Sequence, residues 1–465
     1  MRTLSNVTTD TIAAISTAQG RSGIGVVRLS GPDARSIATR MLRLRDDLAP
    51  NHARFASIID EHGARIDAGV VTWFAAPHSY TGEDVVEIAA HGSPVVLEWI
   101  VRRAITLGAR AARPGEFTER AFLNHRIDLT QAEAVRDLID AQTLEQARVA
   151  AEQVGGSLAA RIRPAKENII ALIAEMEAGI DFAEDDIDTL PSEAIVERLN
   201  AVRAPMEELL ASFAYGRVLH AGVKMAIIGR PNAGKSSLFN RLVESDRAIV
   251  TAIAGTTRDV VSERVSLGGI PVELMDTAGL REATDEVERI GIARSQQAMA
   301  EADIVLLVLD AEAGINEEER HLIGAMRNRS LLIVQNKIDL LGSDHTDDAT
   351  LNALSESLGH YTATHRVSAK TGEGIEDLRA AILNLLRGSA VQERSGVLTN
   401  VRQQQAVHRS VDGLHRAHQA ATSNLPHEML LLDIYEALRG MDELTGETTP
   451  DDVLGLIFST FCIGK

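Results

Sequence analysis

Residues 224–242, KMAIIGRPNAGKSSLFNRL, combine a short apolar run, a glycine-rich loop and a helical pattern. The loop, GRPNAGKSS at 229–237, has P-loop spacing and the strand-to-helix context that makes this pattern specific. Its backbone N–H groups can face phosphates at a helix N-terminus, Lys235 can neutralise phosphate oxygens, and the Ser236 hydroxyl can bind Mg²⁺. A glycine-rich turn that binds nothing is the alternative. The stretch predicts a nucleoside triphosphate site in a parallel α/β domain.

Further loops in the same segment specify the nucleotide. DTAG at 276–279 and NKID at 336–339 each end an apolar run, and Asp339 can accept two hydrogen bonds from guanine that adenine cannot donate. SAK at 368–370 is expected to close over the base, and AGTTRD at 254–259 supplies a switch threonine. The motifs predict a GTP site formed by Asn232, Ala233, Gly234, Lys235, Ser236, Ser237, Thr256, Thr257, Asp276, Thr277, Ala278, Gly279, Asn336, Lys337, Asp339, Ser368, Ala369 and Lys370.

The residue after DTAG indicates an unusual hydrolytic site. Many small GTPases carry a water-orienting glutamine there, whereas this chain has Leu280. Carboxylates in LREATDEVERIG at 280–291, among them Glu288, are candidates for that role, and a solvated helix start is the alternative. Asn232 offers a side-chain oxygen for a monovalent cation beside the phosphates, although asparagine also simply suits the turn.

Changes in hydrophobic period divide the chain into segments. Residues 1–118 alternate short apolar runs with Gly and Pro turns, which predicts a compact α+β domain. Residues 119–216 and 389–465 have helical spacing, and 217–388 alternate strand-like and helical patterns, as in a mainly parallel sheet covered by helices. The predicted fold is a multidomain α/β protein in which a P-loop GTPase domain is inserted into a helical domain.

Composition limits the partners and the compartment. The formal charge is −19, yet residues 1–125 hold 14 Arg against 13 acidic residues, so any contact with nucleic acid must be local. No apolar run is long enough to span a bilayer, and no membrane association is expected. One cysteine and the lack of a signal-like stretch predict a cytoplasmic protein.

Over nearly its full length the chain resembles the MnmE family, also called TrmE, the tRNA uridine 5-carboxymethylaminomethyl modification GTPases. The resemblance rests on the GTPase motifs and on GRSGIGVVRLSG at 20–31, YTGEDVVEIAAHG at 80–92, RPGEFTERAFLN at 113–124 and CIGK at 462–465. It implies an N-terminal domain, similar to the folate-binding domains of one-carbon enzymes, that pairs two chains. It further implies a helical domain and an inserted GTPase domain.

The resemblance also implies residue roles that spacing does not reveal. Taken alone, Arg28 and Glu87 would be ordinary surface residues. A tetrahydrofolate site, for 5,10-methylene-tetrahydrofolate or its analogue 5-formyl-tetrahydrofolate, is implied at Arg28, Glu87, Arg126 and Lys465. Potassium is implied at Asn232, Thr251, Ile253 and Thr256, Mg²⁺ at Ser236 and Thr257, a further GTP contact at Thr251, and a catalytic, water-orienting role for Glu288.

The function implied is that of a potassium-dependent GTPase acting on the wobble uridine of certain tRNAs. With an FAD- and NADH-dependent partner, a homodimer would install a carboxymethylaminomethyl or aminomethyl group at C5, within a heterotetramer or larger complex. Two rivals share the GTPase motifs: a ribosome-assembly GTPase, and a potassium-regulated signalling switch. A folate site in the first 125 residues and a need for the CIGK tail would count against the first rival, and altered tRNA nucleosides against the second.

The single cysteine, Cys462, stands in that tail. The plain interpretation is a small apolar residue that packs beside Phe458 and Phe461. The resemblance suggests that the apolar residues anchor the tail so that Cys462 and Lys465 lie near the folate site. A catalytic role for the Cys462 thiol is a further hypothesis, because a nucleophilic thiol needs a pKa lowered by nearby positive charge.

Overall fold

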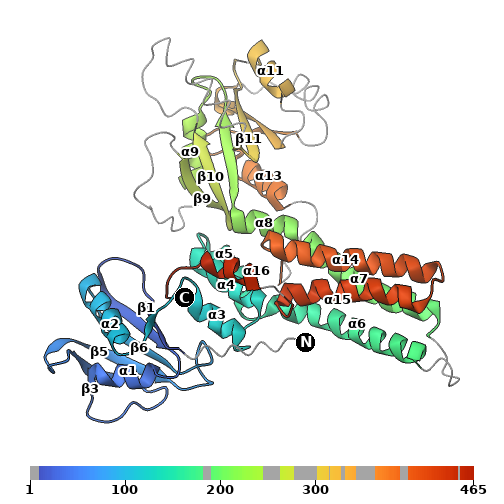
Figure 1. The fold of residues 1–465 in the computed structure, drawn as a ribbon. Coiled ribbons are helices and arrows are strands. Elements are labelled where there is room, and N and C mark those ends of the chain that lie inside the picture. The colour runs from blue at the N-terminus through green and yellow to red at the C-terminus, as the bar shows by residue number, and fades with distance from the viewer. Residues whose placement is uncertain are drawn as a thin grey trace. The chain divides into compact units, whose positions relative to one another are not determined.

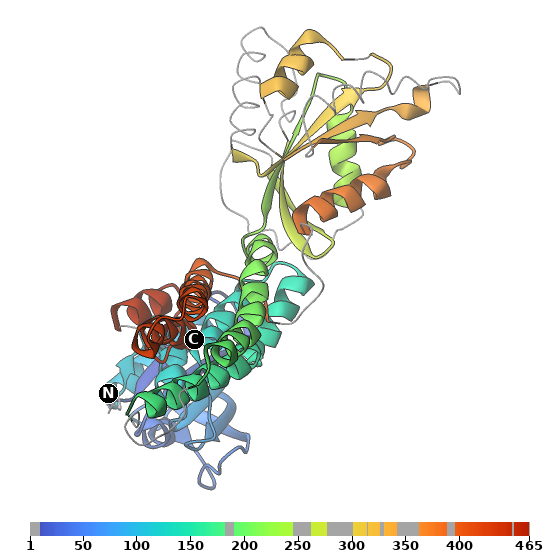
Figure 2. The same ribbon diagram turned by 90° about the vertical axis from the view of Figure 1, so that its right-hand side faces the viewer.

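The structure is a computed structural model that describes residues 10–181, 190–244, 262–276, 301–313, 315–325, 330–341, 362–387, 396–448 and 451–464 (Figures 1 and 2). Its internal contacts divide the chain into two compact units. The first comprises Met1–Arg136, Gln153–Lys166 and Ile434–Lys465, and the second comprises Asp137–Glu152 and Glu167–Asp433.

The first unit is built on a seven-stranded sheet in the order β3-β4-β5-β6-β2-β1-β7. The strands pair antiparallel except β1 with β7. The helices α1 (Ala34–Arg40) and α2 (Pro94–Thr106) contribute to a core in which every second strand residue is buried, as the alternation predicts. The strands are β1 (Ile12–Ile15), β2 (Ser22–Ser30), β3 (Leu42–Arg43), β4 (Arg54–Ile59), β5 (Arg65–Phe74), β6 (Val85–Gly92) and β7 (Arg110–Ala111).

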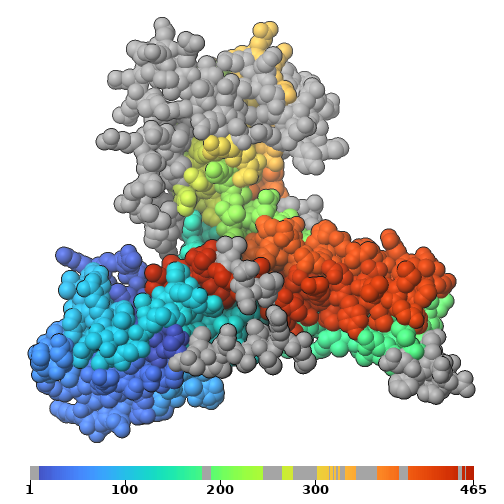
Figure 3. All heavy atoms as spheres, in the orientation of Figure 1, coloured from blue at the N-terminus to red at the C-terminus, as the bar shows by residue number. Residues whose placement is uncertain are grey.

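A helical group completes this unit and holds the C-terminal segment. It contains α3 (Glu116–Leu123), most of α4 (Leu129–Asp140), α16 (Asp451–Ser459), the start of α6 (Ser157–Asp181) and the end of α15 (His427–Thr445). Leu129, Ala132, Leu454, Phe458 and Phe461 form a small apolar core between them. The dark red atoms of this C-terminal segment lie against the cyan atoms of α3 and α4 in Figure 3.

The second unit contains a six-stranded sheet in the order β13-β12-β11-β8-β10-β9. All its neighbouring strands are parallel except β9 and β10. Both faces are covered: α9 (Lys235–Glu244) and α13 (Ile375–Arg387) pack on one, and α11 (Glu317–Ala325) on the other (Figure 2). The strands are β8 (Val223–Ile228), β9 (Ser262–Leu267), β10 (Ile270–Asp276), β11 (Ile304–Asp310), β12 (Ser330–Asn336) and β13 (Thr362–Arg366).

Burial on both faces explains why these strands are apolar without alternation. In β8, Met225 and Ile227 join the core under α9 and α13, whereas Ala226 and Ile228 join the core under α11. In β11 the first six residues are all buried. The fold-class prediction, a mainly parallel GTPase sheet beside an α+β domain and helices, is confirmed.

The second unit also contains helices that precede the sheet in the chain and one that follows it. They are α5 (Leu144–Val154), α7 (Ser192–Ala211), α8 (Phe213–Ala221) and α14 (Val401–Thr422). Of these, α7 packs against α14 and α8. Gly216 of α8 lies so close to the Leu398 carbonyl that a Cβ there would be 2.0 Å from its oxygen. The predicted limits 1–118, 119–216, 217–388 and 389–465 stay predictions. In the described part of the chain, no helix is both long and apolar enough to cross a membrane.

Candidate functional site

The phosphate-binding loop lies between β8 and α9. Asn232 and Gly234 have positive φ angles of 64° and 90°, and α9 begins at the next residue, Lys235. Such alternation of backbone conformation turns successive N–H groups toward one point. The loop therefore forms an anion cradle at the start of a ten-residue helix.

Lys235 brings positive charge into this loop. Its side chain is buried, and its ammonium group donates hydrogen bonds to the carbonyl oxygens of Gly229 at 2.8 Å and Arg230 at 2.9 Å. These neutral acceptors hold the charge beside the cradle. A phosphate oxygen is a stronger acceptor because a charge-assisted hydrogen bond is about twice as strong as a neutral one.

The side chain of Asn336, at the end of β12, joins three motifs into one site. Asn336 is 2% exposed; its amide nitrogen donates to the Ala233 carbonyl at 2.9 Å, and its amide oxygen accepts from the Ala369 N–H at 3.0 Å. A Cβ on Gly234 would lie 2.2 Å from that amide nitrogen, so only glycine fits there. The bonds fasten the phosphate loop to the loop expected to cover the base.

Asp339 is held in a defined orientation at the base-binding end. The Ser368 hydroxyl donates to its Oδ1 at 2.7 Å. Lys337, with φ of 70°, points its ammonium group at Asp310 Oδ2 at 2.7 Å. Burial alone would raise the pKa of Asp310, but the Lys337 bond and nearby amide N–H groups lower it below its ordinary value.

The N-terminal candidate residues lie on the sheet of the first unit. Arg28 of β2 and Glu87 of β6 are directly opposite each other, and Arg28 donates to Glu87 Oε1 from Nη2 at 2.7 Å and from Nε at 2.9 Å. The guanidinium carbon lies 5.6 Å from the ring centroids of both Tyr80 and Phe117. Arg126 lies beside Gly82: a Cβ added to Gly82 would be 3.2 Å from the Cγ of Arg126.

A buried ionic cluster holds the loop that carries Tyr80 and Gly82. Arg120 is 1% exposed and donates to Glu83 Oε2 at 3.0 Å, to Asp10 Oδ1 at 2.7 Å and to Glu116 Oε1 at 3.2 Å. A buried cation with three carboxylate partners restricts the arrangement of the segments that supply them. The aromatic wall beside Arg28 therefore has a defined position.

The C-terminal segment crosses the same unit. Phe458 and Phe461 are buried with ring centroids 5.5 Å apart, and the Gly115 N–H donates to the Cys462 carbonyl at 3.3 Å. Gly464 lies against the backbone of Ile15, where a Cβ would be 2.2 Å from the carbonyl oxygen. Ile15 of β1 pairs with Val27 of β2, the neighbour of Arg28. The tail therefore lies beside β1, the strand next to the one that carries Arg28.

Known proteins resemble this chain over nearly its full length. A family model for the MnmE helical domain matches residues 129–462, and one for the GTP-binding protein TrmE N-terminus matches residues 11–126. The tRNA modification GTPase MnmE of Koribacter versatilis is 55% identical over 461 residues, which is 98% of this chain and 99% of that protein. The chain belongs to the MnmE family. The MnmE of Aquifex aeolicus is 42% identical over 457 residues, again 98% of this chain and 99% of that one.

Membership in the MnmE family confirms the resemblance, but part of the predicted site lies outside the described residues. Asp276 ends β10, and its backbone pairs with Ile227 next to the phosphate loop, although nothing is described of its side chain. The tail residue Lys465 is also outside the described part. The remaining predicted residues outside it are Thr251, Ile253, Thr256, Thr257, Thr277, Ala278, Gly279 and Glu288.

The structure also adds residues to the MnmE site that the motifs did not indicate. Arg241 of α9 donates to the carbonyl oxygens of Ala369 at 3.2 Å and Lys370 at 2.9 Å, so it braces the SAK loop. Arg230 pairs with Glu319 of α11 at 2.7 Å. A basic residue in the last turn of a helix, such as Arg241, carries no sequence signal for such a role.

Proposed function

We propose that this chain hydrolyses GTP and uses that reaction in tRNA modification. The observation that supports it best is the Asn336 side chain, which bonds both the phosphate loop and the base loop and so gives a triphosphate and a guanine one continuous site. Asp339, oriented by Ser368, supplies the acceptor that distinguishes guanine from adenine.

The residues of the loop have separable tasks in this proposal. The cradle at 232–236 binds the β- and γ-phosphates, and Lys235 moves from its carbonyl partners to a phosphate oxygen. The Ser236 hydroxyl is exposed at the first turn of α9, where it can hold Mg²⁺ together with Thr257. Bound Mg²⁺ would neutralise charge that develops on the phosphates.

The potassium site and the hydrolytic residue belong to the same proposal. The exposed Asn232, in its left-handed conformation, can offer its amide oxygen to K⁺ beside the phosphates, with Thr251, Ile253 and Thr256 completing the set. Glu288 orients the attacking water in place of the missing glutamine. These assignments extend the resemblance to residues outside the described part.

For the N-terminal unit we propose a tetrahydrofolate site around Arg28, Glu87 and Arg126, closed by Cys462 and Lys465 of the tail. The partly exposed Tyr80, backed by the buried Phe117, offers the aromatic surface that a pterin ring needs, and Arg28 already lies over it. Because Arg28 and Glu87 bond each other, a folate must replace this ion pair with its own carboxylate and ring donors. The chemistry is one-carbon transfer to C5 of a tRNA wobble uridine, with an FAD- and NADH-dependent partner, in a cytoplasmic complex of two or more chains.

Base specificity provides the first test. Asp339→Asn replaces an acceptor by a donor, so we expect GTP affinity to fall at least about 30-fold and xanthosine triphosphate, which carries an acceptor at that edge, to bind better. Asp303→Asn is the matched control. Equal affinity of Asp339→Asn and wild type for GTP would refute the guanine assignment.

Folate binding that depends on the C-terminal tail distinguishes the modification enzyme from the rival GTPases. Calorimetry with 5-formyl-tetrahydrofolate should show binding that disappears when the last four residues are removed, with GTP binding unchanged. Unaltered tRNA nucleosides after gene deletion would refute the modification role and leave a GTPase of another kind.

A further inference from the structure

The loop between α4 and α5 carries a capping box whose side chains bond in two directions. Thr143 Oγ1 accepts from the Gln146 N–H at 3.1 Å, and Gln146 Oε1 accepts from the N–H groups of Thr143 at 3.1 Å and Gln142 at 2.7 Å. This reciprocal pattern satisfies N–H groups at the start of α5. A hydroxyl and an amide each retain a donor, which is free for another element.

Both remaining donors are used on the GTPase sheet. The Thr143 hydroxyl donates to the Gly269 carbonyl at 2.6 Å, in the turn between β9 and β10. The Gln146 amide donates to the carbonyls of Leu219 at 2.8 Å and His220 at 3.3 Å, where α8 ends and the chain turns into β8. We call this set of bonds the α5 clamp.

Gly269 is suited to this contact by its backbone. Its φ is +88°, and a Cβ would lie 2.6 Å from the Glu145 Cβ, so the turn approaches α5 as closely as glycine allows. Thr143 itself is 9% exposed. The hydroxyl-to-carbonyl bond is therefore largely shielded from water, which would otherwise compete for both groups.

The two strands that begin at the α5 clamp end at the proposed GTP site. β8 leads into the phosphate loop at Gly229, and β10 ends at Asp276 of the DTAG motif. β9 is the edge strand of the described sheet and pairs with β10 alone. The turn that Thr143 holds therefore sets where the β9 edge lies.

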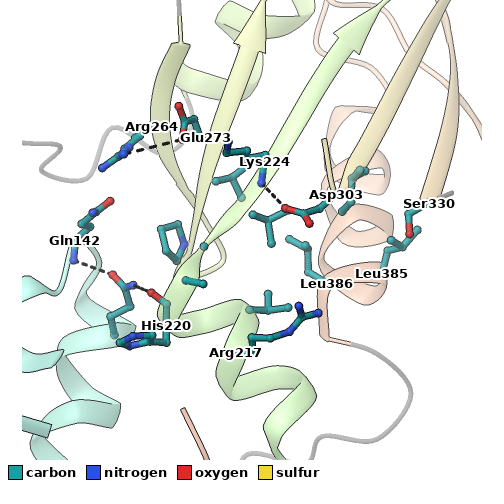
Figure 4. A pocket seen from close by; sticks show the side chains of 18 of the residues that line it. Gln142, Arg217, His220, Lys224, Arg264, Glu273, Asp303, Ser330, Leu385 and Leu386 are labelled. Atoms are coloured by element: carbon teal, nitrogen blue, oxygen red, sulfur yellow. Dashed lines mark hydrogen bonds and ion pairs between the residues drawn. The ribbon is translucent and has the colours of Figure 1, made fainter. Parts of the chain in front are cut away.

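A cavity of about 630 Å³ lies beside the clamp, at the N-terminal ends of the parallel strands (Figure 4). Its lining includes Gln142, Arg217, Lys224 and Arg264. Next to this cavity the hydrogen bonds of the clamp join α5 to the sheet, and Val149 of α5 packs against the core of the sheet.

The charges around this cavity do not indicate a ligand site. Lys224 pairs with Glu301 at 3.7 Å, and Arg264 pairs with Glu273 at 4.0 Å. Figure 4 shows Lys224 apart from Arg264 and Glu273, so these labelled groups do not converge on one point.

We propose that Thr143 and Gln146 are positioning residues for GTP hydrolysis, which transmit the state of the nucleotide site to α5. The proposal rests on the GTPase activity proposed above. When the nucleotide changes the ends of β8 and β10, the α5 clamp requires α5 to follow. Without the clamp, GTP still binds, but the hydrolytic arrangement and the response of α5 are lost.

Three full-length variants separate this role from helix stability. Thr143→Val removes the hydroxyl at nearly constant shape, and Thr143→Ser is its control because it keeps the hydroxyl. Gln146→Glu keeps the oxygen that caps α5, since glutamate is the usual residue of a capping box, but loses the donor to the α8 carbonyls. Thermal unfolding checks that each variant is folded. If Thr143→Val does not fold, Gln146→Glu provides the test in its place.

Steady-state GTP hydrolysis and hydrogen exchange provide the two readouts. Thr143→Val, which loses one hydrogen bond, should lower kcat about fivefold, and Gln146→Glu, which loses two, should lower it at least as much, with KM within about twofold for both. Exchange in α5 should differ between GDP and a non-hydrolysable GTP analogue in wild type and Thr143→Ser, but not in the other two. In wild type and all three variants, hydrogen exchange in the phosphate loop should still differ between GDP and the GTP analogue.

The proposal is overturned if Thr143→Val keeps wild-type kcat and the wild-type response of α5, or if Thr143→Ser is as impaired as Thr143→Val. It is also overturned if α5 of wild type does not respond to nucleotide. A wild-type chain that neither binds nor hydrolyses GTP would instead refute the proposed function.

Discussion

Replacement of Asn336 by alanine tests the joint between the phosphate loop and the base loop. Asn336 is almost fully buried and makes one hydrogen bond to each loop, at 2.9 Å and 3.0 Å. A neutral hydrogen bond contributes about 1 to 1.5 kcal/mol net, so losing two costs about 2 to 3 kcal/mol. Since 1.4 kcal/mol is a tenfold change, we expect GDP affinity to fall about 30- to 150-fold.

Titration with a fluorescent GDP analogue measures this loss directly. Gln335→Ala is the matched control because it removes the neighbouring side chain of β12 and leaves both bonds in place. Urea unfolding without nucleotide shows whether each variant is folded. If folded Asn336→Ala binds GDP within threefold of wild type, the two hydrogen bonds do not hold the site together and the reasoning is wrong.

Three further predictions concern the rest of the molecule. Arg120→Leu removes the buried cation that joins Glu83, Asp10 and Glu116, although Arg110 still pairs with Asp10 and Glu116. It should cost about 3 kcal/mol of unfolding free energy, measured in urea against Arg113→Leu on the surface. The lowered pKa of Asp310 means that its ion pair stabilises the fold above the ordinary carboxyl value of 3.8 and is lost as pH falls through the folded pKa. Asp310→Asn should therefore be less stable than wild type by up to about 1 kcal/mol at pH 7, with the gap closing below pH 3.8, and a pH-independent gap would contradict this. Phe461→Ala removes a buried ring and should cost about 3 kcal/mol of unfolding free energy in urea, whereas Thr460→Ala should cost little; equal stability of the two variants would show that the ring does not anchor the tail.

Much of this molecule could be predicted from its sequence, because the decisive signals are local. A P-loop needs glycines and a lysine at set spacing, and a parallel sheet buried on both faces needs nearly continuous apolar strands, as in IVLLVLD at 304–310. The change of period near residue 217 likewise predicts where an inserted domain begins. Family membership follows from such stretches and needs no coordinates.

Tertiary structure alone decided which distant residues cooperate. Arg28 and Glu87 are 59 positions apart and bond each other, Arg241 braces a loop 128 positions away, and Thr143 reaches Gly269 across 126 positions. A single arginine or threonine carries no mark of its partner, because pairing depends on strand register and helix packing over the whole chain. The sequence by itself determined the class of chemistry and the order of the domains. The fold determined how the phosphate loop, the base loop and α5 are joined, since those bonds exist only where the backbone brings the groups within about 3 Å.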